Sequence, residues 1–259
     1  MSKREHISYS ELKDWNTCPH YHKKAWVEKV APFEGNEYTA FGSAIHDVCE
    51  KKLLKEDINE GAVFQLGFAQ RLQELLEKNI EFDAKRVQEM KVAGPAILAE
   101  VEDALQDYFG DYEVFSSEEM LYVPIENFNV YFKGFVDAVV KVGDTYHLFD
   151  WKTCSWGWDS RRKSEKMVTY QLTLYKHFFC QKHNINPEQV ETHFALLKRT
   201  AKKDRVEIFR VTSGPKKTEN ALKLLYQAIY NIIKGVSIKN RLNCLKPYRC
   251  KLYNTEHCR

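Results

Sequence analysis

A strand–turn–strand pattern over residues 138–151 constrains the fold of this chain more than any other feature of its sequence. The segment AVVKV is rich in strand formers, Gly143-Asp144 is a turn pair, and TYHLFDW resumes an apolar and aromatic pattern. Such a pattern predicts a β-hairpin, whose two strands lie side by side in a sheet.

Two carboxylates flank this hairpin. Asp137 lies near the start of the first strand, and Asp150 lies near the end of the second, in the run Asp150-Trp151-Lys152. Because hairpin strands are neighbours, we expect both carboxylates to come together beside the ammonium group of Lys152. Carboxylate oxygens suit Mg²⁺ or Mn²⁺, and a nearby lysine can orient water or stabilise negative charge. Taken alone, Asp-x-Lys is more often a solvated surface pair, so a metal site needs further support.

Helical periodicity dominates the first 110 residues, and strand patterns follow it. The predicted helices cover residues 8–30, 41–55, 60–79, 83–109, 165–183 and 215–234, with Pro19 and Pro95 as candidate breaks. The predicted strands cover residues 114–123, 130–140, 145–151, 191–198 and 205–211. This order predicts an α/β fold with a mixed central sheet and flanking helices. We expect one domain over residues 1–259, with a helical part (1–110), an α/β core (111–215) and a C-terminal helix with a basic tail (216–259).

Charge is distributed unevenly along the chain. Residues 196–259 carry 16 Lys or Arg against 4 Asp or Glu, a net charge of +12, whereas the remainder is net −9. A basic segment of this kind favours a polyanionic partner such as nucleic acid, although a solvated helix surface has the same composition. No apolar run is long enough to span a membrane, and no apolar segment follows the first charges. We therefore expect a cytoplasmic protein without membrane contact.

Four short motifs follow one another in a characteristic order. GSAIH places His46 one turn after a glycine on a predicted helix, GFVD and DWK lie on the hairpin, and the first and last residues of QLTLY share one helix face. With the opening ISYSELKDWNTCPHYHKKAW, this order resembles the RecB-like branch of the PD-(D/E)xK nuclease superfamily. Similar proteins are the AddB nuclease domain and the CRISPR-associated adaptation nucleases.

The resemblance implies a restriction-endonuclease-like core behind a helical N-terminal region. His46, Asp137, Asp150 and the backbone carbonyl of Trp151 would then bind Mg²⁺ or Mn²⁺. One or two such ions supply a nucleophile and stabilise charge on a phosphate. Without the motif order, His46 would be interpreted as a core histidine.

The same resemblance implies roles for three more side chains. Lys152 would contact the attacking water and the scissile phosphate, and Gln171 and Tyr175 would steady the site and approach the DNA backbone. Gln171 and Tyr175 are also compatible with ordinary helix packing. Glu118 and Glu119 precede the hairpin, and we expect them to be solvated edge carboxylates.

Four of the seven cysteines form a second resemblance. Some RecB-like nucleases hold a 4Fe–4S cluster with one cysteine from the N-terminal helix and three from the C-terminus, a layout that Cys18, Cys244, Cys250 and Cys258 match. The last three lack the close Cys-x-x-Cys pair that is usual in those proteins. A cluster, a zinc ion and reduced thiols without a metal therefore all stay open.

A short aromatic and basic segment follows the Asp-x-Lys motif. It contains Trp156, Trp158, Arg161, Arg162 and Lys163. Aromatic rings beside cations suit single-stranded DNA, because bases stack on the rings and phosphates meet the charges. Core tryptophans followed by a solvated loop are the alternative.

These features predict a metal-dependent deoxyribonuclease, an exonuclease that prefers single-stranded DNA or DNA ends. It would serve recombination, repair, replication or the processing of foreign DNA in a prokaryotic or phage-infected cell. The chain has no GxxxxGK[ST] motif of a helicase motor. Two alternatives remain, a non-catalytic DNA-binding protein that retains the fold and an RNA-directed nuclease. Protein partners and digestion polarity are not predicted.

Overall fold

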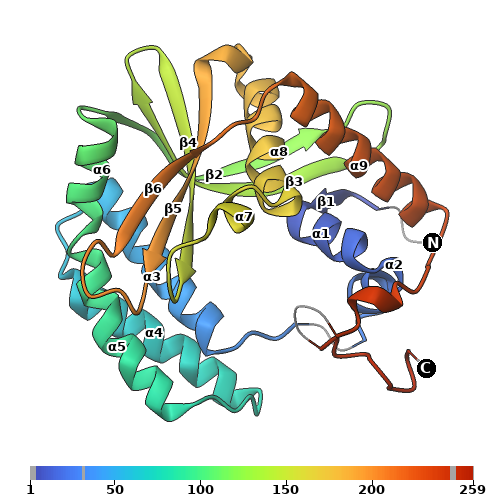
Figure 1. Cartoon of the computed structure of the whole chain (residues 1–259), viewed down its shortest axis with the longest axis horizontal. Helices are drawn as coiled ribbons and strands as arrows, with labels where there is room; N and C mark the ends of the chain where they lie inside the picture. Colours follow the sequence, from blue (N-terminus) through green and yellow to red (C-terminus); the bar gives the residue numbers. More distant parts are fainter. Residues whose placement is uncertain (1–3, 31–32, 246–248, 259) are drawn as a thin grey trace. The chain divides into compact units, whose positions relative to one another are not determined.

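A computed structural model describes residues 4–30, 33–245 and 249–258 of the chain, and Figure 1 shows its elements. The chain forms two compact units. The first, here called the core unit, comprises Glu34–Leu121 and Phe135–Ser213. The second, the terminal unit, comprises Met1–Phe33, Tyr122–Gly134 and Gly214–Arg259. The expected single domain with boundaries near residues 110 and 215 stays a prediction, and residues 246–248 of its basic tail lie outside the described residues.

The core unit combines helices with most of the strands. Its helices are α3 (Glu37–Leu53), α4 (Glu60–Glu77), α5 (Ala84–Leu98), α6 (Val101–Phe109), α7 (Ser160–Lys163), α8 (Lys166–His183) and the short 3₁₀ turn η2 (Pro187–Gln189). Its strands are β4 (Thr145–Cys154), β5 (Val190–Lys198) and β6 (Val206–Val211). No helix in the described part of the chain is long and apolar enough to cross a membrane.

The strands form a mixed sheet. They bond in the order β1-β3-β4-β5-β6, and β2 (Glu113–Pro124) also pairs with β3 (Tyr131–Val142). The predicted hairpin is present, since β3 and β4 are antiparallel, whereas β4 and β5 are parallel and β5 and β6 antiparallel. Gly143 at the hairpin turn has a φ of 57°, a conformation that glycine adopts without the strain a side chain would add.

Alternate residues of β4 face two different layers of the core unit. Phe149 and Trp151 join the hydrophobic core that α3 to α6 build on one side of the sheet. Helix α8 packs against β4 and β5. Because successive strand residues point to opposite faces, Asp150 faces the α8 side. This arrangement is the expected mixed sheet with flanking helices.

The terminal unit contains β1 (His6–Ser8), α1 (Tyr9–Thr17), α2 (Pro19–His22), the π-helical turn η1 (Lys23–Val27), α9 (Pro215–Ile233) and the turn η3 (Arg241–Asn243). Strand β1 runs parallel to the start of β3. The Ser8 side chain accepts a hydrogen bond from the Glu11 N–H and caps α1. Pro19 occupies the first turn of α2 and divides the N-terminal helix, as predicted.

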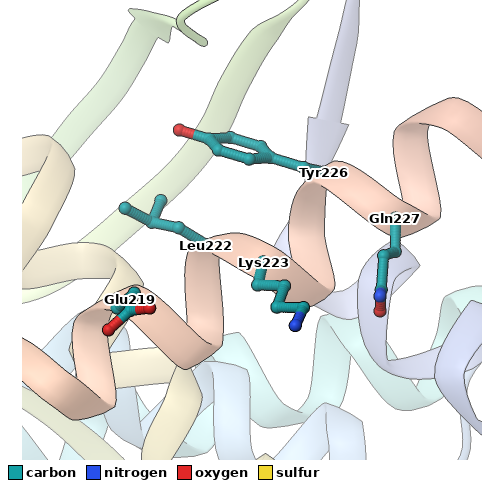
Figure 2. A pocket seen from close by; sticks show the side chains of 5 residues that line it. All are labelled: Glu219, Leu222, Lys223, Tyr226 and Gln227. Carbon is teal, nitrogen blue, oxygen red and sulfur yellow. The ribbon is translucent and has the colours of Figure 1, made fainter.

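An open hollow of about 370 Å³ lies along one helix of the terminal unit. Its lining residues all belong to α9: Glu219, Leu222, Lys223, Tyr226 and Gln227. Figure 2 shows Leu222 and Tyr226, four residues apart, pointing to the same side of the helix.

One predicted helix break differs from the structure, and one strand was not predicted. Pro95 lies inside α5, which continues to Leu98, so the helical segment divides after Leu98 and not at the proline. Proline removes only its own N–H, and its carbonyl still accepts a bond from the Ala99 N–H. Strand β1 was not predicted, because three residues are too few for a periodic pattern.

Candidate active site

The hairpin places Asp137 and Asp150 on the same side of the sheet. Ala138 pairs with Phe149 across the two strands, so Asp137 and Asp150 lie one step further along on the opposite face. The Asp137 carboxylate is held by the backbone of the neighbouring strand, because the Trp151 N–H donates to Asp137 Oδ2 at 2.7 Å.

His46 reaches this pair from α3. The helix begins with a capping box at Asn36 and Thr39. The Nδ1 atom of His46 lies 3.6 Å from Asp137 Oδ2, and its ring also hydrogen-bonds the main chain of Trp151. Gly42, one turn earlier, faces β4: a Cβ there would be 3.2 Å from Thr153 Oγ1. The glycine therefore lets α3 approach β4 closely.

Lys152 and Gln171 hold the two oxygens of Asp150. The Lys152 Nζ forms an ion pair with Asp150 Oδ2. Gln171 of α8 donates from Nε2 to Asp150 Oδ1 at 2.7 Å and to the Tyr175 hydroxyl at 3.3 Å. Gln171 and Tyr175, which were predicted to share one helix face, are therefore both linked to Asp150 by hydrogen bonds, Tyr175 through Gln171.

Burial shifts the pKa values of these groups toward their neutral forms. It raises the pKa values of Asp137 and Asp150 to about 6, against the opposing effect of Lys152. It lowers the pKa of His46 to about 4. The imidazole is therefore neutral at neutral pH, and the carboxylates become mostly ionised only above about pH 6, so a bound cation would extend their ionised range to lower pH.

The donor types suit a hard divalent cation, and the ligand atoms of His46, Asp137 and Asp150 do not yet lie all within 4.8 Å of one another. The set combines two carboxylates with a neutral imidazole, and each carboxylate has one oxygen fixed by an N–H donor, as ligating carboxylates usually have. Mg²⁺ and Mn²⁺ both accept such ligands. The structure thus brings together His46, Asp137, Asp150, Lys152, Gln171, Tyr175 and the Trp151 main chain, and their roles stay predictions.

Glu118 and Glu119 differ in their exposure. Glu119 is buried, contrary to the expected solvated position, and pairs with Lys182 and His183, each at 2.7 Å. Glu118 is exposed, as expected, and has a φ of 47°, unusual for a strand residue with a side chain. Partial desolvation raises its pKa, and Glu50, Asp47 and Asp150 raise it further. Glu118 therefore adds negative charge beside the acid pair.

The aromatic and basic segment divides into exposed and packed residues. Trp156 is 71% exposed, and Arg161 and Arg162 are also exposed. Trp158 packs against Phe194 and carries the Arg162 guanidinium over its ring at 4.8 Å.

Lys163 forms an ion pair with Glu207. Its charge is therefore already compensated within the protein, so Trp156 and the two arginines are the residues of the predicted DNA-binding set that remain available to a ligand.

The four predicted cluster cysteines lie in one region of the terminal unit. Burial raises the pKa of the Cys244 thiol, and Cys250, Cys258 and Cys18 each raise it further. The Cys250 N–H donates to the Cys244 carbonyl, and the Asn240 N–H donates to the Cys18 sulfur. The chain ends therefore bring their thiols together, but no three Sγ atoms among the described cysteines lie within 4.8 Å of one another.

Sequence reasoning missed a second polar cluster. Of the groups that the described residues form, only His147, Glu191 and His193 have ligand-type atoms all within 4.8 Å of one another. The available signal was a polar residue at alternate positions of a strand, Glu191 and His193, in an otherwise apolar segment. Their proximity to His147 depends on the pairing of β4 with β5, which the sequence alone does not reveal.

The fold and the site define a restriction-endonuclease-like α/β protein with an acidic hairpin. A family model of the PD-(D/E)XK nuclease superfamily matches residues 6–254, and the chain belongs to this superfamily. The protein is accordingly a nuclease, of a group that uses divalent metal ions on nucleic acid. No curated protein matches the chain significantly.

Solved structures are similar to this chain at low sequence identity, and the first of the three named here shows the same fold. A candidate exonuclease from Eubacterium rectale is 14% identical with a TM-score of 0.57, over 96% of this chain and 86% of the other. The protein SSO0001 is 11% identical with a TM-score of 0.41, over 92% and 80% of the two chains. LHK-Exo in complex with dAMP is 12% identical with a TM-score of 0.25, over 76% and 97%.

Proposed function

We propose that this protein is a metal-dependent deoxyribonuclease of the RecB-like branch, an exonuclease that prefers single-stranded DNA or DNA ends. One observation supports the proposal: His46, about ninety residues before the hairpin, approaches Asp137, while Lys152 pairs with Asp150 on the neighbouring strand. Such convergence of an imidazole, two acids and an amine in a low-dielectric site favours catalysis over a structural role.

The residues of the site have separable tasks in this reaction. A divalent ion bound by His46, Asp137 and Asp150 would polarise water and neutralise charge on the scissile phosphate. Lys152 would donate hydrogen bonds to the attacking water and a phosphate oxygen, where negative charge develops. Gln171 would keep Asp150 in its orientation.

Exposed residues after β4 support a single-stranded substrate. Trp156 offers an aromatic face for base stacking, and Arg161 and Arg162 offer charges for phosphates. All three follow the Asp-x-Lys motif closely in the sequence, and in this proposal they contact a strand held at the site. An RNA strand could make the same contacts. Cleavage assays on DNA and RNA oligonucleotides of one sequence therefore decide between the two substrates.

The cysteine group supports an iron–sulfur cluster more than a zinc ion. Four thiolates on one zinc ion, with Zn–S bonds near 2.3 Å, lie within about 4 Å of one another, which the described thiols do not. A larger iron–sulfur core accommodates wider spacing. Anaerobically purified protein should be brown with broad visible absorbance, and a colourless protein that contains zinc would contradict the cluster.

Lys152→Ala tests the catalytic assignment. Removal of the amine should slow Mg²⁺-dependent cleavage of end-labelled DNA by about 10²–10³-fold, since the developing charge on phosphate loses its donor. Binding to the same oligonucleotide without metal should remain. Lys141→Ala is the matched control, because Lys141 lies in the same hairpin but over the Tyr146 ring. This variant should cleave the DNA at the wild-type rate.

The same assay separates the alternatives. A circular single-stranded DNA should resist an exonuclease, and its cleavage would indicate internal hydrolysis. Wild-type protein without any metal-dependent cleavage would favour a non-catalytic DNA-binding protein. Equal cleavage by wild type and Lys152→Ala would place the site elsewhere.

A further inference from the structure

A second group of metal-type ligands lies in the core unit, on the other face of β4 from the acid pair. His147 belongs to β4, and Glu191 and His193 belong to β5, where His147 pairs directly with Glu191. His147 shares a strand face with Phe149 and Trp151, which join the core with α3 to α6. Asp150, three residues further on, points to the opposite face.

The three facing atoms have the spacing of a tetrahedral metal site. His147 Nδ1 and His193 Nε2 are 3.1 Å apart. Glu191 Oε2 lies 3.7 Å from His147 Nδ1 and 3.9 Å from His193 Nε2. Zinc with nitrogen and oxygen ligands at about 2.0–2.1 Å sets ligand separations of about 3.3 Å in a tetrahedron. Movements of a few tenths of an ångström would close the triangle around one ion.

Neighbouring residues orient two of these ligands. The Tyr108 hydroxyl of α6 lies 3.3 Å from His193 Nδ1, so the tautomer that donates to Tyr108 aims the Nε2 lone pair at the other two ligands. Arg210 of β6 holds the second carboxylate oxygen, Glu191 Oε1, at 2.8 Å. In His193 one ring nitrogen is thus held by a neighbour while the other faces the site, and the same is true of the two carboxylate oxygens of Glu191. This arrangement is typical of ligating histidines and carboxylates.

Access also favours a metal. His193 is almost fully buried, whereas the side chains of His147 and Glu191 are 13% and 25% exposed. An ion can therefore enter from the side of these two residues.

We propose that His147, Glu191 and His193 form a zinc site distinct from the catalytic site. Two imidazoles and one carboxylate suit zinc better than Mg²⁺, which prefers oxygen ligands. The ion would join the parallel strands β4 and β5 and, through Tyr108, hold α6 against them. Because the three ligands lie on the opposite sheet face from Asp150, this proposal does not depend on the proposed nuclease chemistry.

The experiment compares metal-stripped wild type with His193→Gln, His147→Gln and His183→Gln after addition of one to several equivalents of Zn²⁺. His183 is the matched control, since its imidazole pairs with Glu119 outside the cluster. Either cluster variant should bind one zinc equivalent fewer than wild type and the control. His147→Gln, at a partly exposed position, keeps the test valid if His193→Gln does not fold. Tyr108→Phe should weaken zinc binding by about 10–100-fold.

Spectroscopy and diffraction distinguish this site from the thiols and the acid pair. Co²⁺ bound here should give visible ligand-field bands that disappear in His147→Gln, whereas thiolate charge-transfer bands in the near ultraviolet would belong to the cysteines. Crystals with Zn²⁺ should show an anomalous peak between His147 Nδ1 and His193 Nε2. Equal zinc content in all variants, or anomalous peaks only at the cysteines or the acid pair, would overturn the proposal.

Discussion

At the scale of single residues, Asp150 is held on both oxygens although it is buried. Lys152 pairs with Oδ2 and Gln171 donates to Oδ1. These two contacts fix the orientation of the carboxylate. Its pKa is raised because the buried environment makes the ionised form less favourable. Groups of this kind are retained where a ligand compensates them, and this favours a bound cation.

Glu118 provides a test of how far the acidic site extends. Its charged neighbours Glu50, Asp47 and Asp150 are all acidic, so its carboxylate adds to the attraction for a divalent ion. Glu118→Gln should raise the Mg²⁺ concentration for half-maximal cleavage about tenfold, equivalent to about 1.4 kcal/mol, while saturating Mg²⁺ restores most activity. Mg²⁺ titrations of cleavage rate measure both quantities.

Glu119→Gln is the control, because the ion pairs with Lys182 and His183 already neutralise that carboxylate. Its Mg²⁺ dependence should stay close to that of wild type. Identical titration curves for the two variants would show that Glu118 does not contribute to cation binding.

At the scale of secondary-structure elements, α5 packs against α4 through a glycine. A Cβ at Gly94 would lie 2.2 Å from the Phe64 ring, which is fully buried and stacked on Phe68. Gly94→Ala should therefore destabilise the protein by about 1–3 kcal/mol, because the ring has no space to move. Thermal unfolding midpoints provide the measurement.

Gly61→Ala is the matched substitution at the start of α4. The nearest atom to its added Cβ would be 3.7 Å away, and alanine favours the helix by up to about 1 kcal/mol. Its midpoint should equal or exceed that of wild type. An equally low midpoint for both variants would show that the Phe64 contact is not the cause.

The first two helices are joined by a buried hydrogen bond between a carboxylate and an imidazole. Glu11 Oε1 of α1 lies 2.7 Å from His22 Nε2 of α2 and also pairs with Arg4. Burial alone would raise the Glu11 pKa, but hydrogen bonds from His22 and Arg4 outweigh it and leave the pKa below the ordinary 4.5. A lowered carboxyl pKa contributes stability above pH 4.5, and this contribution is lost as pH falls through the folded-state value.

Glu11→Gln should accordingly lower the unfolding midpoint at pH 7. Its deficit relative to wild type should shrink as the pH falls from about 4.5 toward 3. Glu5→Gln, at an exposed position, should show no deficit at either pH. A deficit for Glu11→Gln that stays constant with pH would mean that packing, and not the carboxylate charge, joins the helices.

At the scale of the whole molecule, local patterns determined what could be predicted. Helical periodicity and the Gly143-Asp144 turn predicted most elements and their order, because these signals extend over a few residues. The approach of Asp137 to Asp150 follows from the hairpin alone. The position of His46 beside the hairpin depends on tertiary packing. It could therefore be predicted only from the order of the motifs.

Other features depend on pairing that no local pattern encodes. The cluster of His147, Glu191 and His193 requires the parallel alignment of β4 with β5 across an intervening helix. The environment of Glu118 requires both an unusual φ and the approach of α3. Neither is visible until the strands and helices are assembled.

Diffraction from crystals soaked with Mn²⁺, recorded at the manganese absorption edge, shows whether the acid pair binds a divalent ion. We expect an anomalous peak about 2.0–2.6 Å from one carboxylate oxygen each of Asp137 and Asp150, with the His46 imidazole beside it. No peak there, with manganese bound only at other sites, would contradict this expectation.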